Sequence, residues 1–431
     1  MKIPQLADMK SCTGCLGCID ICPQNAIVKT KGSDGHVYVT VDEDLCVGCL
    51  KCERFCKKLH DGTYADNSTT SASFVAKNTN EDFYLRATSG GVFPAVAEYV
   101  INQGGCVYGA AWEDNGRSVR HVRIEKVEDI RLLQGSKYVQ SDTSYIYIKV
   151  EEDLHLGKMV LFTGTGCQVA AVLEYCKKSS NNHLLYTMDL VCGGVPSSLL
   201  MDRFVDNANP SFSKVVHFRV KENYRFAYED TSGNIVKCKK ALPLDGFKSS
   251  LTSRYSCYEC SFAGLHRKSD WTIGDYWGDK EGKGCRSLVM CHNDRAKRIV
   301  DNLDGIEIEK MDNWSFVYNN PRIVSFPFMR GRLERRILAW NFQHLSYKTL
   351  CKIYASDTKK CDVLWMMYKV YRLLRYKLSM YNYKKHLRKT MNVKMLNNLT
   401  GGGKTNLVIT KQLDTIFREQ NGINPYYINA A

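Results

Sequence analysis

The sequence predicts a cysteine-rich α+β module, then a larger α/β domain, and then a basic helical tail. Three observations predict this order. Eight cysteines fall into two runs of equal spacing within the first 56 residues. Two strand–loop–helix units follow between residues 159 and 205, which is the pattern of a parallel sheet with right-handed crossovers. Residues 363–394 carry nine lysines or arginines and no acid.

The two cysteine runs have the spacing of a module that binds two 4Fe-4S clusters. Each run reads C-x₂-C-x₂-C-x₃-C, in which three thiolates bind one cluster and the fourth binds the cluster of the other run. A zinc module or a disulfide scaffold is the alternative, but zinc sites use four ligands each and rarely this doubled spacing. We therefore expect one set formed by Cys12, Cys15, Cys18 and Cys56, and a second formed by Cys46, Cys49, Cys52 and Cys22.

Local signals around the cysteines are typical of a bacterial ferredoxin. Pro23 follows the first run as in those proteins, whereas Lys57 takes that position after the second run. Between the runs, residues 37–41 alternate as a strand that should pair with residues 26–28. Glycines lie between the ligands, where the backbone has to bend sharply: Gly14, Gly17 and Gly48.

Length and composition limit the number of domains and the cellular compartment that we expect for the chain. Its 431 residues suffice for two or three domains. The first residues do not resemble a signal peptide, no run of eighteen apolar residues occurs, and nineteen cysteines suit a reducing compartment, so we expect a cytoplasmic protein. We expect the boundaries to be 1–60 for the two-cluster module, 61–80 for a linker, 81–328 for the α/β domain and 329–431 for the tail.

The α/β domain should bring two thiols to one edge of its sheet. A helix capped by Ser89 is expected first, followed by a strand from residue 106. Cys167 and Cys192 each follow a strand, and the carboxyl ends of parallel strands form the edge at which open sheets bind ligands.

The pair Cys257 and Cys260, in a C-x-x-C pattern, can complete a third 4Fe-4S set with Cys167 and Cys192. Separate buried thiols with a redox-active C-x-x-C pair are the alternative. Seven cysteines lack paired ligand spacing and are expected to be small buried hydrophobic residues: Cys106, Cys176, Cys238, Cys285, Cys291, Cys351 and Cys361.

Several motifs, in order, resemble the coenzyme F420 hydrogenase/dehydrogenase beta-subunit family over residues 86–327, here behind a two-cluster ferredoxin domain. These motifs are RATSGGVF from Arg86, GGCVYGA from Gly104, GSKYVQS from Gly135, GTGCQ from Gly164, CGGVPS from Cys192, the Cys257–Cys260 pair and SDWTIGDYWG from Ser269. The resemblance implies a flavoprotein that binds FAD beside a 4Fe-4S cluster and exchanges electrons with a hydride carrier, which in the namesake enzymes is the deazaflavin coenzyme F420.

By the same resemblance, the residues that bind FAD would be Ser89, Gly90, Gly91, Ser136, Lys137, Gln140, Ser141, Thr163, Gly164 and Thr165. Glycines allow close backbone approach, a helix amino terminus at Gly90 offers amides to a phosphate, and Lys137 can neutralise it. An ordinary capped helix and an exposed lysine loop are the alternative interpretation.

Two positions depart from the family pattern. Gly166 replaces the usual proline before the first thiol, and Gly193 replaces the usual histidine after the second. Both thiols are kept, so cluster binding is expected to survive, but the hydride carrier is left open. Family members serve several pathways, including surface-polysaccharide synthesis.

We therefore predict an iron–sulfur flavoprotein oxidoreductase that passes electrons between ferredoxin-type clusters and a hydride carrier through FAD. No catalytic acid or base is assigned, because the chemistry belongs to the cofactors. The alternative is a non-catalytic electron-transfer subunit that feeds a partner enzyme, with surface-polysaccharide synthesis as one setting. The partner is expected to be a redox protein or a soluble hydride carrier.

The net charge of +15 raises the question of a nucleic-acid partner. Much of it lies in the tail, and no aromatic recognition motif accompanies it, so we expect no nucleic-acid binding. Apolar residues at helical spacing from Val363 to Leu378 predict a basic amphipathic helix. It would contact an anionic inner membrane surface or another subunit, or remain a solvated face.

Overall fold

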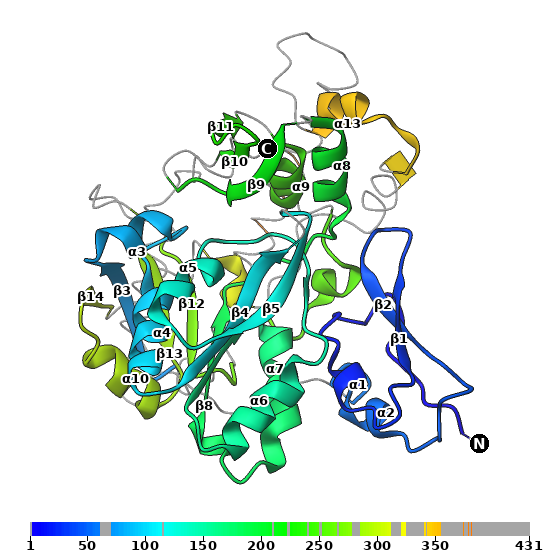
Figure 1. Ribbon diagram of the computed structural model, residues 1–431, viewed down its shortest axis with the longest axis horizontal. Coiled ribbons are helices and arrows are strands. Elements are labelled where there is room, and N and C mark those ends of the chain that lie inside the picture. Colours follow the sequence, from blue (N-terminus) through cyan, green and yellow to red (C-terminus); the bar gives the residue numbers. More distant parts are fainter. Residues whose placement is uncertain are drawn as a thin grey trace.

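The computed structural model has three connected parts (Figure 1): a small module that contains the amino terminus, a large α/β domain, and a cap above it. It describes residues 2–60, 70–113, 116–208, 211–221, 225–238, 241–249, 252–264, 267–277, 285–311, 320–324, 340–341 and 343–354, with three single residues further on.

The module consists of two short helices and one hairpin. Its elements are α1 (Gly17–Asp20), β1 (Ile27–Lys31), β2 (Val37–Val41) and α2 (Lys51–Phe55). Strands β1 and β2 are antiparallel and pair Ile27 with Val41, which confirms the expected hairpin. In the first cysteine run, Gly14 has a φ of 69° and Leu16 a φ of 57°. The second run repeats these values, with 67° at Gly48 and 58° at Leu50, so both runs follow the same path.

Gly17 is required for a different reason than the expected bend. It lies inside α1, and a Cβ atom there would lie 2.4 Å from Cε1 of Phe55. Close packing of α1 on α2 therefore excludes a side chain at this position.

A nine-stranded mixed sheet forms the centre of the α/β domain. The order is β14-β3-β13-β12-β8-β7-β4-β5-β6, and the four strands β12, β8, β7 and β4 are mutually parallel. The predicted parallel pairing is confirmed, because Val160 of β7 lies beside Leu185 of β8. The strands are β3 (Ala72–Asn78), β4 (Cys106–Glu113), β5 (Ser118–Ile124), β6 (Ser141–Asp142), β7 (Val160–Gly164), β8 (Leu185–Leu190), β12 (Trp271–Asp275), β13 (Ser287–Cys291) and β14 (Ile306–Lys310).

Residues 72–78, predicted to belong to a linker, form strand β3 of this sheet. They pair with β13 on one side and β14 on the other, and the linker prediction is wrong for them. Small residues such as Ala72, Ser73 and Ala76 gave this stretch a loop-like composition, yet these three are buried. Residues 61–69 lie outside the described part of the chain.

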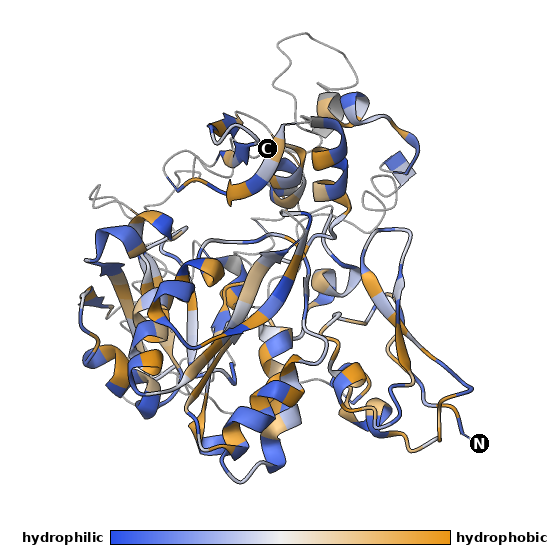
Figure 2. Cartoon of the chain, in the orientation of Figure 1, coloured by the Kyte–Doolittle hydropathy of each residue, from blue (hydrophilic) through white to orange (hydrophobic). Residues whose placement is uncertain are grey.

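Helices cover both faces of the sheet. Val107 and Leu161 belong to the core under α4, whereas Tyr108 and Phe162, one residue further along, belong to the core under α6 and α7. Figure 2 shows these helices with both hydrophobic and hydrophilic stretches. One face carries α3 (Glu81–Arg86), α4 (Val92–Asn102), α5 (Ile130–Leu133, after the 3₁₀ turn Val127–Asp129) and α10 (Asp294–Asp301); the other carries α6 (Ile146–His155) and α7 (Gly166–Tyr175).

Helix α4 begins two residues later than expected. Gly91, with a φ of 80°, occupies the N-cap position, and the Ser89 hydroxyl instead donates to the carbonyl of Arg286, 2.8 Å away. The prediction of a Ser89 cap is therefore wrong, because a contact with a distant segment takes its hydroxyl.

The cap is a second, smaller layer. Its antiparallel sheet has the order β11-β10-β9, formed by β9 (Phe212–His217), β10 (Phe226–Asp230) and β11 (Ile235–Cys238). Leu200, Leu242 and Leu350 bring α8 (Leu199–Ala208), α9 (Leu242–Ser249) and α13 (Tyr347–Tyr354) together. The remaining 3₁₀ turns are Cys176–Lys178, Asn182–Leu184, Tyr255–Glu259 and Pro321–Val324.

The predicted tail is described only in part. Helix α13 lies within residues 329–431 and packs on the cap. The predicted basic helix, Val363 to Leu378, lies outside the described residues apart from Leu374 and Leu378. In the described part of the chain, no helix is long and apolar enough to cross a bilayer.

We expect Gly90→Ala to destabilise the α/β domain. A Cβ atom at this position would lie 2.2 Å from the carbonyl oxygen of Ala76 and 2.5 Å from the amide of Ser287, so the backbone of β3 or β13 would have to move. Overpacking of this kind costs about 1–3 kcal/mol. The measurement is the thermal unfolding midpoint, which should fall.

Gly193→Ala is the matched control, because its Cβ atom would meet Phe247 Cζ at 3.4 Å, an ordinary contact. Its midpoint should stay near that of the wild type. Equal midpoints for both variants would contradict the packing described at Gly90.

Candidate functional site

The first predicted cysteine set comes together at the start of the chain. Burial raises the pKa of the Cys15 thiol to about 11, and Cys12 and Cys56 add to the rise. Burial also raises the pKa of Cys18, with Cys15, Cys12 and Cys56 among the further causes. The last cysteine of the second run therefore lies with three cysteines of the first, as the spacing predicts.

The second predicted set surrounds a small cavity. Cys22, Cys46, Cys49 and Cys52 all line it, together with apolar residues that include Ile27. Burial raises the pKa of Cys52 to about 11, and Cys22 is the first thiol among the further causes. Cys52 in turn contributes to the raised pKa of Cys18, so the first and second sets are neighbours.

The third predicted set is assembled from three separate segments. Cys167 is the second residue of α7, Cys192 follows β8, and the Cys257–Cys260 pair spans the end of the 3₁₀ turn Tyr255–Glu259. Burial raises the pKa of Cys167, with Cys260 as the next cause. Burial likewise raises the pKa of Cys257 to about 12, with Cys260 and then Cys192 as further causes.

The third set adjoins the first. Cys15 is among the thiols that raise the pKa of Cys167. The three sets therefore follow one another in space, second, first and third. Cys167 and Cys192 also line a large pocket, so the third set ends at its wall.

Arg322 holds the third set from a distant part of the chain. Its Nε donates to the carbonyl of Cys192 at 3.0 Å, and its Nη2 lies 3.4 Å from the carbonyl of Cys257. Sequence reasoning missed this residue, because no local pattern relates it to either cysteine.

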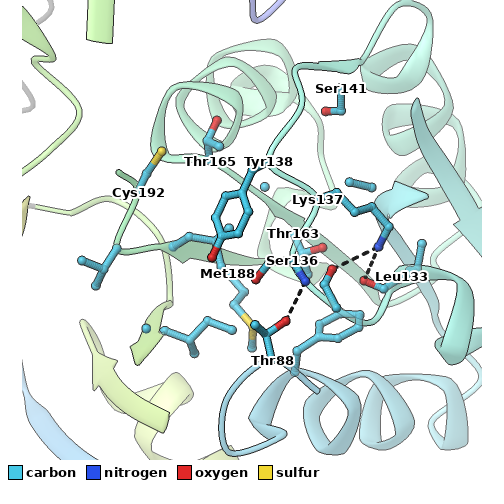
Figure 3. A pocket seen from close by; sticks show the side chains of 18 of the residues that line it. Thr88, Leu133, Ser136, Lys137, Tyr138, Ser141, Thr163, Thr165, Met188 and Cys192 are labelled. Carbon is cyan, nitrogen blue, oxygen red and sulfur yellow. Dashed lines mark hydrogen bonds between the residues drawn. The ribbon is translucent and has the colours of Figure 1, made fainter. Parts of the chain in front are cut away.

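The pocket has a volume of about 300 Å³ and lies at the carboxyl ends of β7 and β8. Figure 3 shows side chains from several segments pointing into it. Nine of the ten residues predicted to bind FAD line this pocket: Ser89, Gly91, Ser136, Lys137, Gln140, Ser141, Thr163, Gly164 and Thr165. The tenth, Gly90, lies behind the wall, where its amide donates to the Ser287 hydroxyl at 2.9 Å.

Lys137 is tied to the end of helix α5. Its Nζ donates to the carbonyls of Leu133, Gln134 and Gly135 at 3.2, 2.9 and 3.2 Å. Figure 3 shows the Lys137 side chain beside Leu133. Burial lowers the pKa of Lys137 to about 7. The alternative of an exposed lysine loop is therefore wrong, because the ammonium group is half-buried among carbonyl oxygens.

His121 forms part of the pocket wall. Its ring stacks on Phe162 with centroids 5.3 Å apart, and its two nitrogens lie 2.9 Å from the Ser141 hydroxyl and the Thr163 carbonyl. Burial lowers the pKa of His121 to about 4, so the imidazole is neutral at pH 7. It therefore fixes the orientation of Ser141, one of the predicted FAD ligands.

Two further interactions close the opposite side of the pocket. Arg219 forms an ion pair with Asp275 at 2.8 Å and donates to the Thr88 carbonyl at 3.0 Å. Tyr138 stacks on Phe247 of the cap with ring centroids 3.7 Å apart. Sequence reasoning missed these contacts, because each joins segments far apart in the chain.

The ferredoxin-type module is docked directly beside this pocket. The carbonyl of Cys15 accepts hydrogen bonds from the hydroxyls of Thr143 and Tyr147, both at 2.7 Å. Asp20 accepts from the amides of Tyr145 and Tyr147 at 2.7 and 2.9 Å, at the start of helix α6. Thr13 and Gly14 line the pocket, so the ligand loop of the first set contributes to its wall.

Two family models match the chain. The model for the C terminus of the beta subunit of coenzyme F420 hydrogenase/dehydrogenase matches residues 157–313, which include all four cysteines of the third set. The model for the 4Fe-4S dicluster domain matches residues 11–58, which include all eight cysteines of the first two sets.

Curated relatives match both parts. A subunit of the F(420)H(2) dehydrogenase of Methanosarcina mazei is 22% identical over 223 residues, which are 50% of this chain and 61% of that protein. The chain thus spans about three fifths of this relative. An uncharacterized ferredoxin of Methanocaldococcus jannaschii is 32% identical over 56 residues, or 13% of this chain and 71% of the ferredoxin.

A chain in the F420-reducing NiFe hydrogenase complex of Methanosarcina barkeri matches with a TM-score of 0.43 and 18% identity, covering 66% of this chain and 92% of that one. The family models carry the assignment, since they cover the cysteines of all three sets. The chain therefore carries a 4Fe-4S dicluster ferredoxin domain at its amino-terminal end and, over residues 157–313, a domain of the coenzyme F420 hydrogenase/dehydrogenase beta-subunit family.

Proposed function

We propose that this iron–sulfur oxidoreductase exchanges electrons between three 4Fe-4S clusters and a hydride carrier through FAD bound in the large pocket. The observation that carries the proposal is the sequence of sites in space. The second, first and third cysteine sets adjoin one another, and Cys167 and Cys192 of the third set line the pocket.

The chemistry of the cysteine sets suits clusters. Burial and mutual repulsion raise the pKa of Cys15, Cys18 and Cys167, so uncompensated thiolates would be costly at these positions. Bound iron would compensate that charge.

The pocket suits FAD in three respects. Apolar walls from Phe93, Leu133 and Met188 can accept a ring system. The left-handed Gly91 begins an eleven-residue helix at one side of the pocket, a position suited to phosphate. Lys137 supplies an ammonium group, and Thr163 to Thr165 lie at the carboxyl end of β7, on the edge where open sheets bind ligands.

FAD would convert single electrons into hydride equivalents, since clusters carry one electron and hydride carriers two. The residues of the chain would bind FAD, orient it and exclude water from the pocket. Neutral His121 orients Ser141, the Arg219–Asp275 ion pair holds the Thr88 loop, and the Tyr138–Phe247 stack covers the side toward the cap.

The identity of the hydride carrier depends on the region around Gly193. A Cβ atom there would contact the Phe247 ring at 3.4 Å, so the histidine usual in the family would start beside Phe247. Coenzyme F420, the carrier named for the relatives, is one candidate, and a different soluble carrier or a redox partner protein is the other.

A non-catalytic electron-transfer subunit is the second candidate, because the relative from Methanosarcina mazei is named as a subunit. Surface-polysaccharide synthesis is one setting proposed for such a subunit. Turnover of a soluble hydride donor by the purified chain, with a one-electron dye as acceptor, separates the two. Reduction of the dye supports the enzyme, and its absence in flavin-loaded protein supports the subunit.

The first test is the cofactor content of protein purified without oxygen. Three four-iron clusters and FAD require about twelve iron atoms and one flavin per chain. Cys260→Ser should lower the iron content to about eight, because it removes a ligand of the third set only. Iron and acid-labile sulfide analysis with flavin release makes the measurement.

Cys238→Ser is the control, since Cys238 is a half-buried cysteine of the cap outside the three sets, and its iron content should equal that of the wild type. About eight iron atoms and no flavin in the wild type would overturn the proposal for the α/β domain.

Lys137 gives a pH-dependent test of the FAD site. Its folded pKa, about 7, lies below the ordinary value of 10.5, so between these values the unfolded chain binds a proton that the folded chain lacks. Stability relative to Lys137→Met should therefore rise as the pH increases from 7 toward 10, and stay constant below 7. Bound FAD should shrink this rise, because its phosphates favour the ammonium form.

The measurement is the difference in unfolding midpoint between wild type and Lys137→Met across this pH range, with and without FAD. Exposed Lys149→Met controls for loss of a positive charge. A rise that FAD leaves unchanged would place the flavin phosphates away from Lys137.

A further inference from the structure

Arg254 is a buried cation at the junction of the module and the α/β domain. Arg254 is fully buried, with an exposed fraction of 0%. Among the described residues, no carboxylate forms an ion pair with it. Burying a guanidinium group without an opposite charge is strongly unfavourable, so this position calls for an anion.

The side-chain hydrogen bonds of Arg254 go to Cys12 of the first set and to Gln140, which itself contacts the loop of that set. Nε donates to the carbonyl of Cys12 at 2.7 Å, and Nη2 lies 3.4 Å from the Cys12 sulfur. Nη1 donates to the Gln140 side-chain oxygen at 2.8 Å, while the Gln140 amide donates to the Gly14 carbonyl at 3.2 Å. The guanidinium carbon lies 4.2 Å from the Tyr38 ring centroid.

The ligand loop is shaped to admit this side chain. A Cβ atom at Gly14 would lie 2.7 Å from Nη1 of Arg254 and 2.3 Å from Nε2 of Gln140. Gly14 also has a φ of 69°, which a residue with a side chain rarely adopts. The loop that carries Cys12 and Cys15 can therefore approach Arg254 only with glycine at this position.

We propose that Arg254 is the counter-charge of the cluster on Cys12, Cys15, Cys18 and Cys56, and that it raises the reduction potential of this cluster above that of the same cluster without it. This inference rests on the proposed function, since it requires a cluster on the first set. The potential of an iron–sulfur cluster depends on its net charge, on hydrogen bonds to its sulfurs and on solvent exposure. Arg254 places a positive charge beside the cluster and a hydrogen bond on the Cys12 sulfur, and it is itself shielded from water.

The direction of the shift in reduction potential follows from the charges involved. Each reduction adds one electron to the cluster, taken from dithionite in a titration, and no proton needs to move. The added negative charge is stabilised by a fixed positive charge in a low-dielectric setting. Arg254 therefore favours the reduced state of the cluster nearest to both the third set and the pocket wall.

The test is a redox titration of each cluster by electron paramagnetic resonance, in the full chain with its clusters. Arg254→Met removes the charge and should lower the reduction equilibrium constant of one cluster at least tenfold, which is about 59 mV for one electron. Arg254→Lys keeps the charge and should stay within about threefold of the wild type. The tenfold shift should persist at about 1 M salt, since the group is buried.

Arg54→Met is the matched control. Arg54 donates to the carbonyl of Cys49 at 2.8 Å, the same kind of contact, but its side chain is exposed. Its effect should be below about twofold at high salt. If Arg254→Met leaves every potential within about twofold of the wild type, or raises it, the proposal is wrong.

Two further variants keep the test decisive. If Arg254→Met does not fold, Gln140→Glu places a carboxylate beside Nη1 and should lower the same potential, so an unchanged potential would overturn the proposal. Cys56→Ser identifies the cluster and should lower the iron content by about four atoms. No loss of iron would refute both the cluster on this set and the role of Arg254, whereas loss of iron with no effect of Arg254→Met would refute the latter alone.

Discussion

The structure depends on holding buried thiols close together. Burial and neighbouring thiols raise the pKa of members of all three sets, among them Cys18, Cys52 and Cys167. Such an arrangement is unfavourable for bare thiolates and favourable around iron, because the metal neutralises the charge that the low-dielectric surroundings cannot. We therefore expect cluster assembly and folding of this region to be coupled, with the bound metal contributing to the free energy of folding.

Docking of the module on the α/β domain places these sets in order. The Cys15 carbonyl accepts from Thr143 and Tyr147, and Phe55 of the module belongs to the core formed by α6 and α7. Cys15 contributes to the raised pKa of Cys167 across this contact. A module joined only by a mobile linker would not keep the first set against the third. Because the module and the α/β domain share a core, the fold itself fixes the distance between the first and third cysteine sets.

The pocket combines segments that the parallel sheet brings to one edge. The loops after β7 and β8 supply Thr165 and Cys192, while the loop before β6 supplies Lys137 and Gln140. The cap covers one side through Phe247. The motifs predicted to bind FAD thus come together in one pocket, and Gly193 also lines it, whereas Gly166 is buried beside Phe262.

The sequence by itself determined the local features: the doubled cysteine spacing, the hairpin of β1 and β2, the parallel pairing of β7 and β8, and the motifs that line the pocket. These follow from short-range periodicity and from ligand spacing, which a single chain displays directly. Only the tertiary structure decided that residues 72–78 form a strand, that Gly91 rather than Ser89 caps α4, and that Arg322 and Arg254 support distant cysteines. These depend on partners in distant segments of the chain, and such contacts leave no local pattern in a sequence.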